Sequence, residues 1–319
     1  MREFLSPRWR LIVGWTAVSI STLIAGFWAF WGSIENFHEG WYFTSLLKNI
    51  GLLLIQYLSP MLVVMLLSIL ALHWRRIGLV VLGCLAIALA IFFHGAHAAV
   101  ELISIPLLVL GGLYFLGDPR PRQWARRCLI GLPILTAAVS GAYPGWRAVH
   151  RVDDGNYGAR VVTGNGVTLL WAPQGPGWPA HYASWQRAER NCALLNADGR
   201  SLANTPQNVW RLPTIDEAVR SLVYRGRNAG GVWDPVHQRA TYRVMPDKDS
   251  PLWNPHSQVI YWWTGTEDGS DKAYRIAYNG YVWALDKRGW GDYWAYRCVR
   301  EPEPPDGLNS SAARKAGPP

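Results

Sequence analysis

Histidine and glutamate side chains cluster at the ends of apolar segments in the first half of the chain. His94 and His97 are three residues apart and Glu101 follows four residues later, so a helix would place them near one face. Glu35 and His38 follow another apolar segment. Imidazole and carboxylate groups suit zinc or another divalent metal, and three protein ligands leave one position open to activate water. The predicted metal ligands are Glu35, His38, His94 and His97, but solvated residues at span ends explain the same pattern.

Aromatic residues are the candidate ligand contacts in the second half. Aromatic faces stack on sugars or bury large interface areas at small entropic cost, although half or more of these residues are expected in the core. The predicted ligand-binding residues are Trp263, Tyr281, Trp283, Trp290, Asp292 and Tyr293, with Trp262 and Trp294 as further candidates. Glu267, Asp268 and Asp271 suggest a calcium site, but calcium needs about six to eight oxygens and such carboxylates are often simply solvated.

Apolar segments in residues 1–143 predict a multi-pass α-helical membrane domain with about five spans. A bilayer core about 30 Å thick requires roughly 20 apolar residues in a helix, because lipid offers unpaired backbone groups no partner. The expected spans are residues 11–31, 50–72, 77–93, 102–116 and 128–143. The first follows several arginines as a signal peptide would, but its length and the missing cleavage site favour a retained anchor.

The charge distribution predicts the orientation of these spans. The net charge of +9 comes from ten basic and five acidic residues up to Tyr143, and 21 and 17 after it. Neither half has a concentrated basic surface, which argues against a nucleic-acid partner. Arginines at the N-terminus, at Arg75 and Arg76, and at residues 120–127 mark the cytoplasmic side. With five spans, the second half would be periplasmic or extracellular, in a bacterial-type inner membrane; without the short fifth span, this orientation reverses.

Short alternating runs after Pro144 predict an α+β domain. Residues 159–171 suggest two strands around a Gly-Asn-Gly turn, and Ser184 begins a helix that extends to Leu195. Thr214 and Glu217 form a capping box at the start of a second helix. Residues 261–264, 273–278, 281–285 and 294–300 are predicted strands of an antiparallel sheet, with Asn279-Gly280 as a hairpin turn.

Residues 158–301 contain several short stretches that resemble the Lcl C-terminal domain family and follow one another in the same order. The most specific are Trp210-Arg211-Leu212-Pro213-Thr214 and Tyr296-Arg297-Cys298-Val299-Arg300. The resemblance implies a C-type-lectin-like fold related to the formylglycine-generating enzymes, and hence ligand binding at a loop surface. It also implies a disulfide between Cys192 and Cys298, which persists in an oxidising compartment. Formylglycine generation in the related enzymes implies redox-active cysteines or a thiol-bound metal. The disulfide would use both cysteines of this domain, so that activity is not expected here.

The sequence leaves three functional hypotheses open. The first is a membrane-anchored extracytoplasmic protein, residues 144–301 of which bind a glycan, an envelope component or a protein. The second is a membrane metal-dependent hydrolase that uses the His/Glu site, and the third is an accessory subunit of a membrane complex. Residues 302–319 are rich in Pro, Ser, Gly and Ala and are predicted to be a disordered tail.

Overall fold

The computed structural model describes residues 6–288 and 294–303 and divides the chain into two compact units. The helical unit is Met1–Val149, and the β-rich unit is His150–Pro319. The change in composition at Pro144 lies inside the last helix of the first unit, which continues to Val149.

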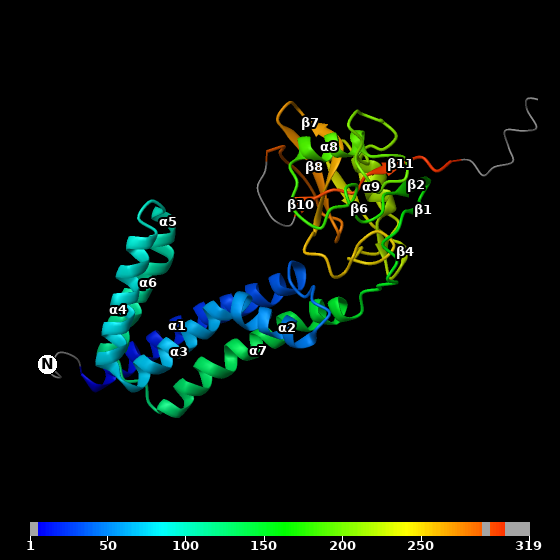
Figure 1. Cartoon of the computed structure of the whole chain (residues 1–319). Coiled ribbons are helices and arrows are strands. Elements are labelled where there is room, and N and C mark those ends of the chain that lie inside the picture. Colours follow the sequence, from blue (N-terminus) through cyan, green and yellow to red (C-terminus); the bar gives the residue numbers. More distant parts are fainter. Residues whose placement is uncertain (1–5, 289–293, 304–319) are drawn as a thin grey trace, which may run out of the picture. The chain divides into compact units, whose positions relative to one another are not determined.

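Helices make up the described part of the first unit (Figure 1). In chain order they are α1 (Pro7–His38), α2 (Leu46–Leu52), the π-helix η1 (Leu53–Tyr57), α3 (Ser59–His73), α4 (Arg75–Phe92), α5 (His97–Ala99), the π-helix η2 (Val100–Ser104), α6 (Ile105–Leu116) and α7 (Arg122–Val149). Helix α1 packs against α3, α6 and α7, and α4 packs against α6.

Three of these helices, α1, α4 and α7, are long and apolar enough to cross a membrane. The segment from α2 to α3 qualifies as a fourth span only as a broken one, because its two parts are bent by 61°. The segment predicted as the fourth span, residues 102–116, lies within the shorter apolar helix Val100–Leu116. The described residues therefore contain three or four candidate spans, where the sequence predicted about five.

Local hydrogen bonding explains the break between α2 and α3. In the π-helix η1 each hydrogen bond spans five residues where an α-helix spans four. The amide of Leu58 accordingly donates to the carbonyl of Leu53 at 2.8 Å. Pro60 follows in the first turn of α3 and has no N–H to continue the ladder. A side chain at Gly32 of α1 would collide with the backbone of Tyr57, so glycine is required for this close approach.

A stripe of small residues allows α1 to approach its neighbours. Ala17, Ser21, Ala25 and Ala29 recur at intervals of four residues and are fully or almost fully buried. The hydroxyl of Tyr114 on α6 donates a hydrogen bond of 3.0 Å to Ser21 Oγ. Small side chains and interhelical hydrogen bonds are the contacts that hold helices together where the surrounding solvent is apolar.

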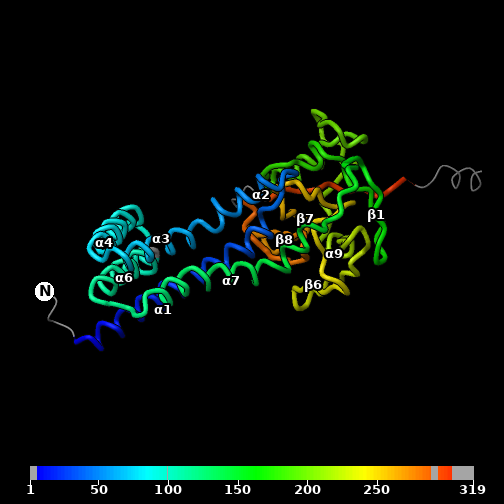
Figure 2. The backbone as a smooth tube through the Cα atoms, turned by 90° about the horizontal axis from the view of Figure 1, so that it is seen from below, coloured from blue at the N-terminus to red at the C-terminus, as the bar shows by residue number. Residues whose placement is uncertain are grey.

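Two short helices and several strands form the second unit. They are β1 (Arg160–Gly164), β2 (Val167–Trp171), α8 (Trp185–Leu194), α9 (Ile215–Ser221), β3 (Val223–Tyr224), β4 (Arg227–Asn228), β5 (Val232–Asp234), β6 (Arg239–Thr241), β7 (Tyr261–Asp268), β8 (Lys272–Ala277), β9 (Val282–Asp286), β10 (Trp294–Ala295) and β11 (Val299–Arg300). The smooth trace in Figure 2 follows the same elements from a second direction.

The main sheet of this unit is mixed, with the strand order β10-β7-β8-β9. β7, β8 and β9 pair antiparallel as predicted, but β10 runs parallel to β7. The predicted strand 294–300 is also divided, because β11 leaves this sheet and pairs with β2. A single antiparallel sheet was therefore the wrong prediction for the C-terminal residues.

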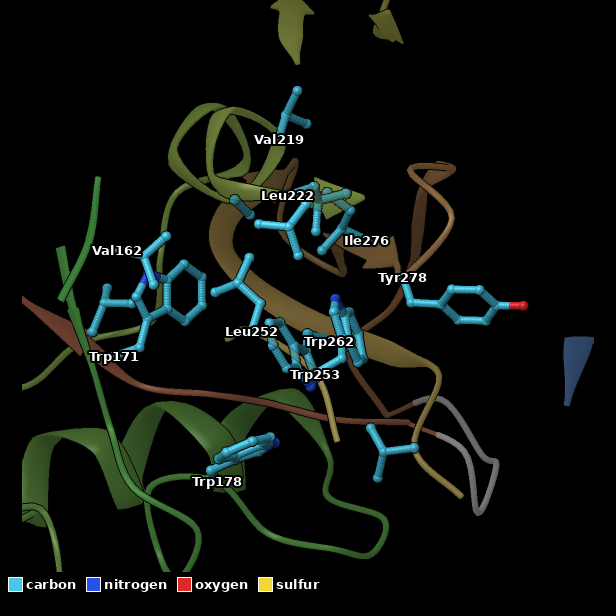
Figure 3. Close-up of a cluster of buried hydrophobic side chains, with 14 of the residues drawn as sticks. Val162, Trp171, Trp178, Val219, Leu222, Leu252, Trp253, Trp262, Ile276 and Tyr278 are labelled. Atoms are coloured by element: carbon cyan, nitrogen blue, oxygen red, sulfur yellow. The ribbon is translucent and has the colours of Figure 1, made fainter. Parts of the chain in front are cut away.

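Tryptophan side chains fill the core beneath this sheet (Figure 3). Trp253 and Trp262 stack with their ring centres 3.7 Å apart and their planes at 11°. Trp171 and Trp178 pack against Trp262 at centroid distances of 5.6 and 6.4 Å. Trp262, a candidate ligand contact from the sequence, is therefore a core residue.

A buried ion pair holds the first residues of the β-rich unit in place. Arg151 Nε lies 3.0 Å from Asp247 Oδ1, and the two side chains are only 6% and 4% exposed. The amide of Val152 donates to Asp249 Oδ1 at 2.7 Å, and the amide of Ser250 donates to the carbonyl of Val152 at 2.9 Å. The segment after α7 is thus part of the folded unit.

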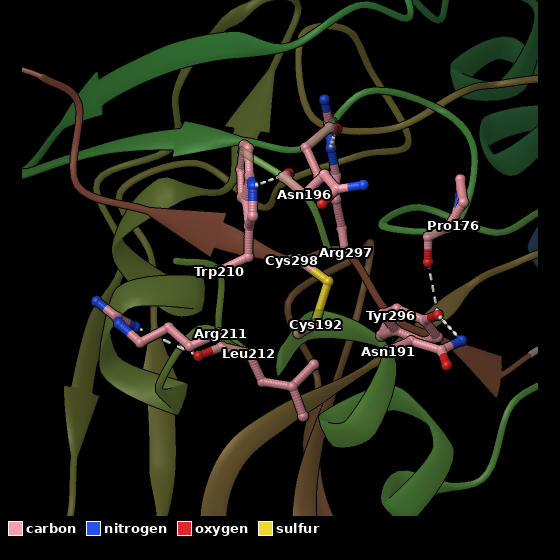
Figure 4. The surroundings of a disulfide bond; sticks show 11 residues. Pro176, Asn191, Cys192, Asn196, Trp210, Arg211, Leu212, Tyr296, Arg297 and Cys298 are labelled. Carbon is pink, nitrogen blue, oxygen red and sulfur yellow. Dashed lines mark hydrogen bonds between the residues drawn. A yellow bond between two sulfur atoms is a disulfide. The ribbon is translucent and has the colours of Figure 1, made fainter. Parts of the chain in front are cut away.

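The predicted disulfide joins Cys192 of α8 to Cys298, which precedes β11 (Figure 4). The bond closes a loop with a sequence separation of 106 residues. Beside it, the hydroxyl of Tyr296 donates to the carbonyl of Pro176 and accepts from the side-chain amide of Asn191, both at 2.7 Å. These contacts fix α8 to the end of the sheet.

Candidate ligand-binding face of the C-terminal domain

One face of the main sheet carries a row of large side chains across three strands. Trp263 on β7 lies opposite Arg275 on β8, and Arg275 lies opposite Trp283 on β9. Directly opposed residues point to the same side of a sheet, so the pairing places the arginine between two tryptophans. Trp263 belongs to the covered part of this face, because its side chain is 1% exposed and donates to the carbonyl of Ala183 at 2.9 Å.

Arg275 is surrounded by aromatic rings. The central carbon of its guanidinium lies 4.1 Å from the ring centre of Tyr261, 4.4 Å from that of Trp294 and 5.1 Å from that of Trp283. Tyr261 begins β7 and Trp294 begins the parallel strand β10, and these two residues are register partners. The mixed sheet therefore brings together rings from three strands around one cation.

The charge of Arg275 has no anionic partner among the described residues. Its Nε and Nη1 atoms are shielded from solvent and make no hydrogen bond there. Burial lowers the pKa of the guanidinium from its ordinary value, yet arginine stays protonated at neutral pH. Leaving a buried donor unpaired costs about 1–3 kcal/mol, and contact with the rings returns about 0.5–2 kcal/mol.

An exposed aromatic platform adjoins the arginine on the edge strand. Tyr281 and Trp283 stack with ring centres 5.7 Å apart and planes at 29°, and their side chains are 57% and 39% exposed. Tyr261 meets Trp283 edge to face at 5.8 Å. β9 is the last strand of the sheet, so no strand among the described residues pairs with its outer edge.

The aromatic face, defined here as Tyr261, Arg275, Tyr281, Trp283 and Trp294, overlaps only in part with the sequence-based set. Tyr281, Trp283 and the further candidate Trp294 lie on it, whereas Trp263 is a core residue. The predicted contacts Trp290, Asp292 and Tyr293 lie outside the described residues. Arg275 was missed, although a charged residue amid the apolar run Ala273-Tyr274-Arg275-Ile276-Ala277 was a detectable signal.

The structure does not assemble the metal site predicted in the helical unit. The turn with His94 and His97 lies at the tip of the α4–α6 hairpin, which diverges from α1, where Glu35 and His38 lie (Figures 1 and 2). Within the described ranges, no group of three or more His, Cys, Asp or Glu residues is arranged to hold a metal. The two histidines lie near each other because they are close in sequence. The glutamate and histidine of α1 are apart from them, because the α4–α6 hairpin diverges from α1.

The proposed calcium ligands are likewise not grouped as a site in the part of the chain that is described. Glu267 lies on β7 and pairs with the ammonium of Lys287. Lys287 also donates to the carbonyl of Ser270 at 2.7 Å, so the lysine already occupies the position beside Glu267. A cation in the position of calcium would compete with Lys287.

Comparison with known proteins leaves the chain without an assigned family. No protein-family model matches it, no curated protein is significantly similar to it, and no solved structure matches its fold.

Proposed function

We propose that this protein is a membrane-anchored binding protein of a bacterial-type cell envelope, with its ligand on the aromatic face of an extracytoplasmic domain. The observation that carries the proposal is the exposed, stacked pair of Tyr281 and Trp283. Tryptophan, tyrosine and arginine are the residue types that dominate binding energies at interfaces. The sequence resemblance to the Lcl C-terminal domain family, with its C-type-lectin-like fold, supports the same function.

The proposed topology has five spans and a cytoplasmic N-terminus. The support for this topology is that arginines from different turns contact the same aspartate. Asp118, between α6 and α7, pairs with Arg75 at the start of α4 and with Arg120 and Arg122 at 3.1 and 3.2 Å. The amide of Asp118 also donates to the carbonyl of Arg10 at 2.7 Å. The basic ends of α1, α4 and α7 thus lie together, as the positive-inside rule requires of one membrane side.

The disulfide supports an oxidising location for the second domain. Structural disulfides persist outside the cytoplasm and are rare within it. Alkaline phosphatase fused after Glu303 is expected to be active in intact cells, because the enzyme requires export to fold. An inactive fusion made in equal amount would place the domain in the cytoplasm and contradict the proposed topology.

Binding is tested with the full-length protein in detergent. Immobilised wild type, Trp283→Ala and the distant control Val236→Ala are exposed to purified peptidoglycan fragments, envelope polysaccharides and envelope proteins. We expect one class to bind wild type and Val236→Ala, and to lose at least tenfold in affinity to a still-folded Trp283→Ala. Binding that is equal in all three proteins would remove the aromatic face from the function. Stoichiometric co-purification of a membrane subunit without such binding would favour an accessory subunit instead.

A further inference from the structure

We propose that the turn of residues 117–121, here called the Asp118 turn, binds the phosphate headgroup of an anionic phospholipid through Arg120 and the adjoining Arg122. The inference rests on the proposed membrane location of the helical unit and is independent of the aromatic face. It makes the turn a lipid-selective contact on the membrane side where the basic helix ends lie.

Contacts with α1 hold the Asp118 turn in place. The amide of Asp118 donates to the carbonyl of Arg10 at 2.7 Å, and the indole N–H of Trp15 donates to the carbonyl of Arg120 at 3.2 Å. A side chain at Gly14 would collide with the backbone of the turn, so glycine permits the close approach of the two segments. The backbone that carries the proposed contacts is therefore fixed before any lipid binds.

Asp118 also orients two exposed guanidinium groups. Arg120 Nε and Arg122 Nη2 donate to its carboxylate at 3.1 and 3.2 Å, and Arg75 at the start of α4 completes the cluster. The side chains of Arg120 and Arg122 are nonetheless 76% and 51% exposed. Each uses one nitrogen for the aspartate, and its exposure leaves the other N–H groups open to a phosphate from solvent.

The helix starts around this turn carry a surplus of positive charge. The starts of α1, α4 and α7 and the Asp118 turn contain eight arginines, at positions 8, 10, 75, 76, 120, 122, 126 and 127, and Asp118 is their one acidic residue within the described ranges. None of the three helices has an acidic residue in its first turn, although such residues are favoured there. Clustered basic residues of this kind are attracted to the negative headgroups of anionic lipids.

Exposed tryptophans indicate that these arginines lie at the depth of lipid headgroups. Trp9, Trp74 and Trp124 each lie within two residues of an arginine at one of the three helix starts, and each is more than half exposed. The guanidinium carbon of Arg127 lies 5.0 Å from the ring centre of Trp124. Tryptophan is enriched at the boundary between hydrocarbon and headgroups, which makes a lipid phosphate the anion expected beside these side chains.

The probes are phosphatidylglycerol and phosphatidylcholine, each with a fluorescent label on an acyl chain. They are titrated into the full-length protein in a neutral detergent, and binding is followed by fluorescence anisotropy. Both lipids contain a phosphate, but the choline group cancels its charge, so the comparison isolates the net charge of the headgroup. Inorganic phosphate is added as a soluble competitor.

Two variants with equal loss of charge locate the contact. Arg120→Gln/Arg122→Gln removes the proposed donors and keeps the pair between the aspartate and Arg75. The matched control, Arg126→Gln/Arg127→Gln, changes exposed residues near the same helix start, which are not among the ion-pair partners of the aspartate in the described chain. Circular dichroism and gel filtration check that both variants are folded.

Wild type is expected to bind phosphatidylglycerol at least about tenfold more tightly than phosphatidylcholine, because each arginine beside an anionic headgroup contributes about fivefold. Arg120→Gln/Arg122→Gln should bind the two lipids alike. The control should keep the preference within about threefold of wild type, because side chains that no carboxylate orients lose more freedom on binding.

Three results would overturn this assignment. Equal affinity of wild type for the two lipids would remove lipid recognition from the turn, while ligand binding that depends on Trp283 would leave the proposed function intact. An equal loss of preference in both arginine variants would assign it to the diffuse charge of the helix starts. Displacement of phosphatidylglycerol by inorganic phosphate would identify a free anion as the ligand.

Discussion

The two units place their large apolar residues in opposite positions. In the helical unit Leu23, Ile55, Phe92 and Leu102 are more than 70% exposed. In the β-rich unit Trp171, Trp253 and Trp262 are at most 1% exposed. The contrast is the one expected if lipid surrounds the helical unit, because water drives apolar surface inward whereas lipid gives no such advantage.

The buried residues differ in the same sense. The face of α1 that packs on its neighbours is built of alanine, serine and glycine, which allow close helix contact. The β-rich unit buries more charged groups, among them Arg151, Asp247 and Arg297, and each of these makes hydrogen bonds or an ion pair within the unit. Close backbone contact therefore organises one unit, while aromatic packing and paired polar groups organise the other.

The largest expected effect comes from breaking the buried ion pair of the β-rich unit. Asp247→Ala leaves Arg151 buried without this carboxylate and should lower the free energy of unfolding by about 3–5 kcal/mol. Chemical unfolding followed by tryptophan fluorescence of the full-length protein measures the change. Asp286→Ala, which removes the partner of exposed Arg288, is the control and should have no measurable effect. Equal stability of the two variants would show that the buried pair is not required.

Removal of the disulfide is the next largest effect. Cys192→Ser with Cys298→Ser should destabilise the β-rich unit by about 2–5 kcal/mol, since the bond restricts a long loop of the unfolded chain. Thermal unfolding in detergent, with and without reductant, measures it. Wild type should lose stability on reduction, and the double variant should not respond. The free cysteines Cys84 and Cys128 are in helices of the other unit, so a response of the double variant to reductant would point to them.

A lysine placed on the outward surface of the helical unit tests whether that surface faces lipid. Leu23 lies near the middle of α1 and is 73% exposed. Leu23→Lys should weaken membrane insertion by about 2.5–3.5 kcal/mol. Val236→Lys, at an 83% exposed position of the β-rich unit, should leave both insertion and folding unchanged. Insertion is measured by carbonate extraction of membranes with α1 as the single span of a fusion protein, and normal insertion of Leu23→Lys would argue against this position as a mid-membrane site.

The smallest expected effect depends on pH. Burial alone would raise the pKa of Glu217, but its hydrogen bonds and ion pair with Arg211 outweigh burial and lower the pKa. The depressed value means that Glu217 stabilises the fold above its unfolded pKa of about 4.3, and that this contribution is lost as pH falls through the folded value. Glu217→Gln should therefore melt below wild type at pH 7, and the two melting temperatures should converge in acid. A constant difference at every pH would exclude this ionisation as the cause.

Local sequence signals predicted much of the β-rich unit correctly. Ser184 caps α8 by accepting from the amide of Arg187, and Thr214 and Glu217 form the predicted capping box. The Gly-Asn-Gly turn separates β1 from β2, with Asn165 and Gly166 both at positive φ. These features depend on residues a few positions apart, which makes them readable from sequence.

Contacts between distant segments were predicted less well. The parallel pairing of β10 with β7 joins Trp294 to Tyr261, and no local pattern distinguishes this from an antiparallel edge. The same pairing places the ring of Trp294 beside Arg275. Because the sequence did not predict this pairing, the predicted ligand contacts left out Arg275 and included the core residue Trp263. The predicted metal ligands are not grouped among the described residues for a related reason, because helix packing decides whether two helix ends meet.

The amino-acid sequence by itself determined the apolar character of the first half, the capped helices and tight turns of the second, and the cysteines available for a disulfide. These properties depend on composition and on spacings within one helix turn or hairpin. Only the tertiary structure decided which aromatic residues are buried, which strands share a sheet and how the charged residues are paired. Those outcomes depend on residues far apart in the chain, where burial and pairing are set by packing against other segments.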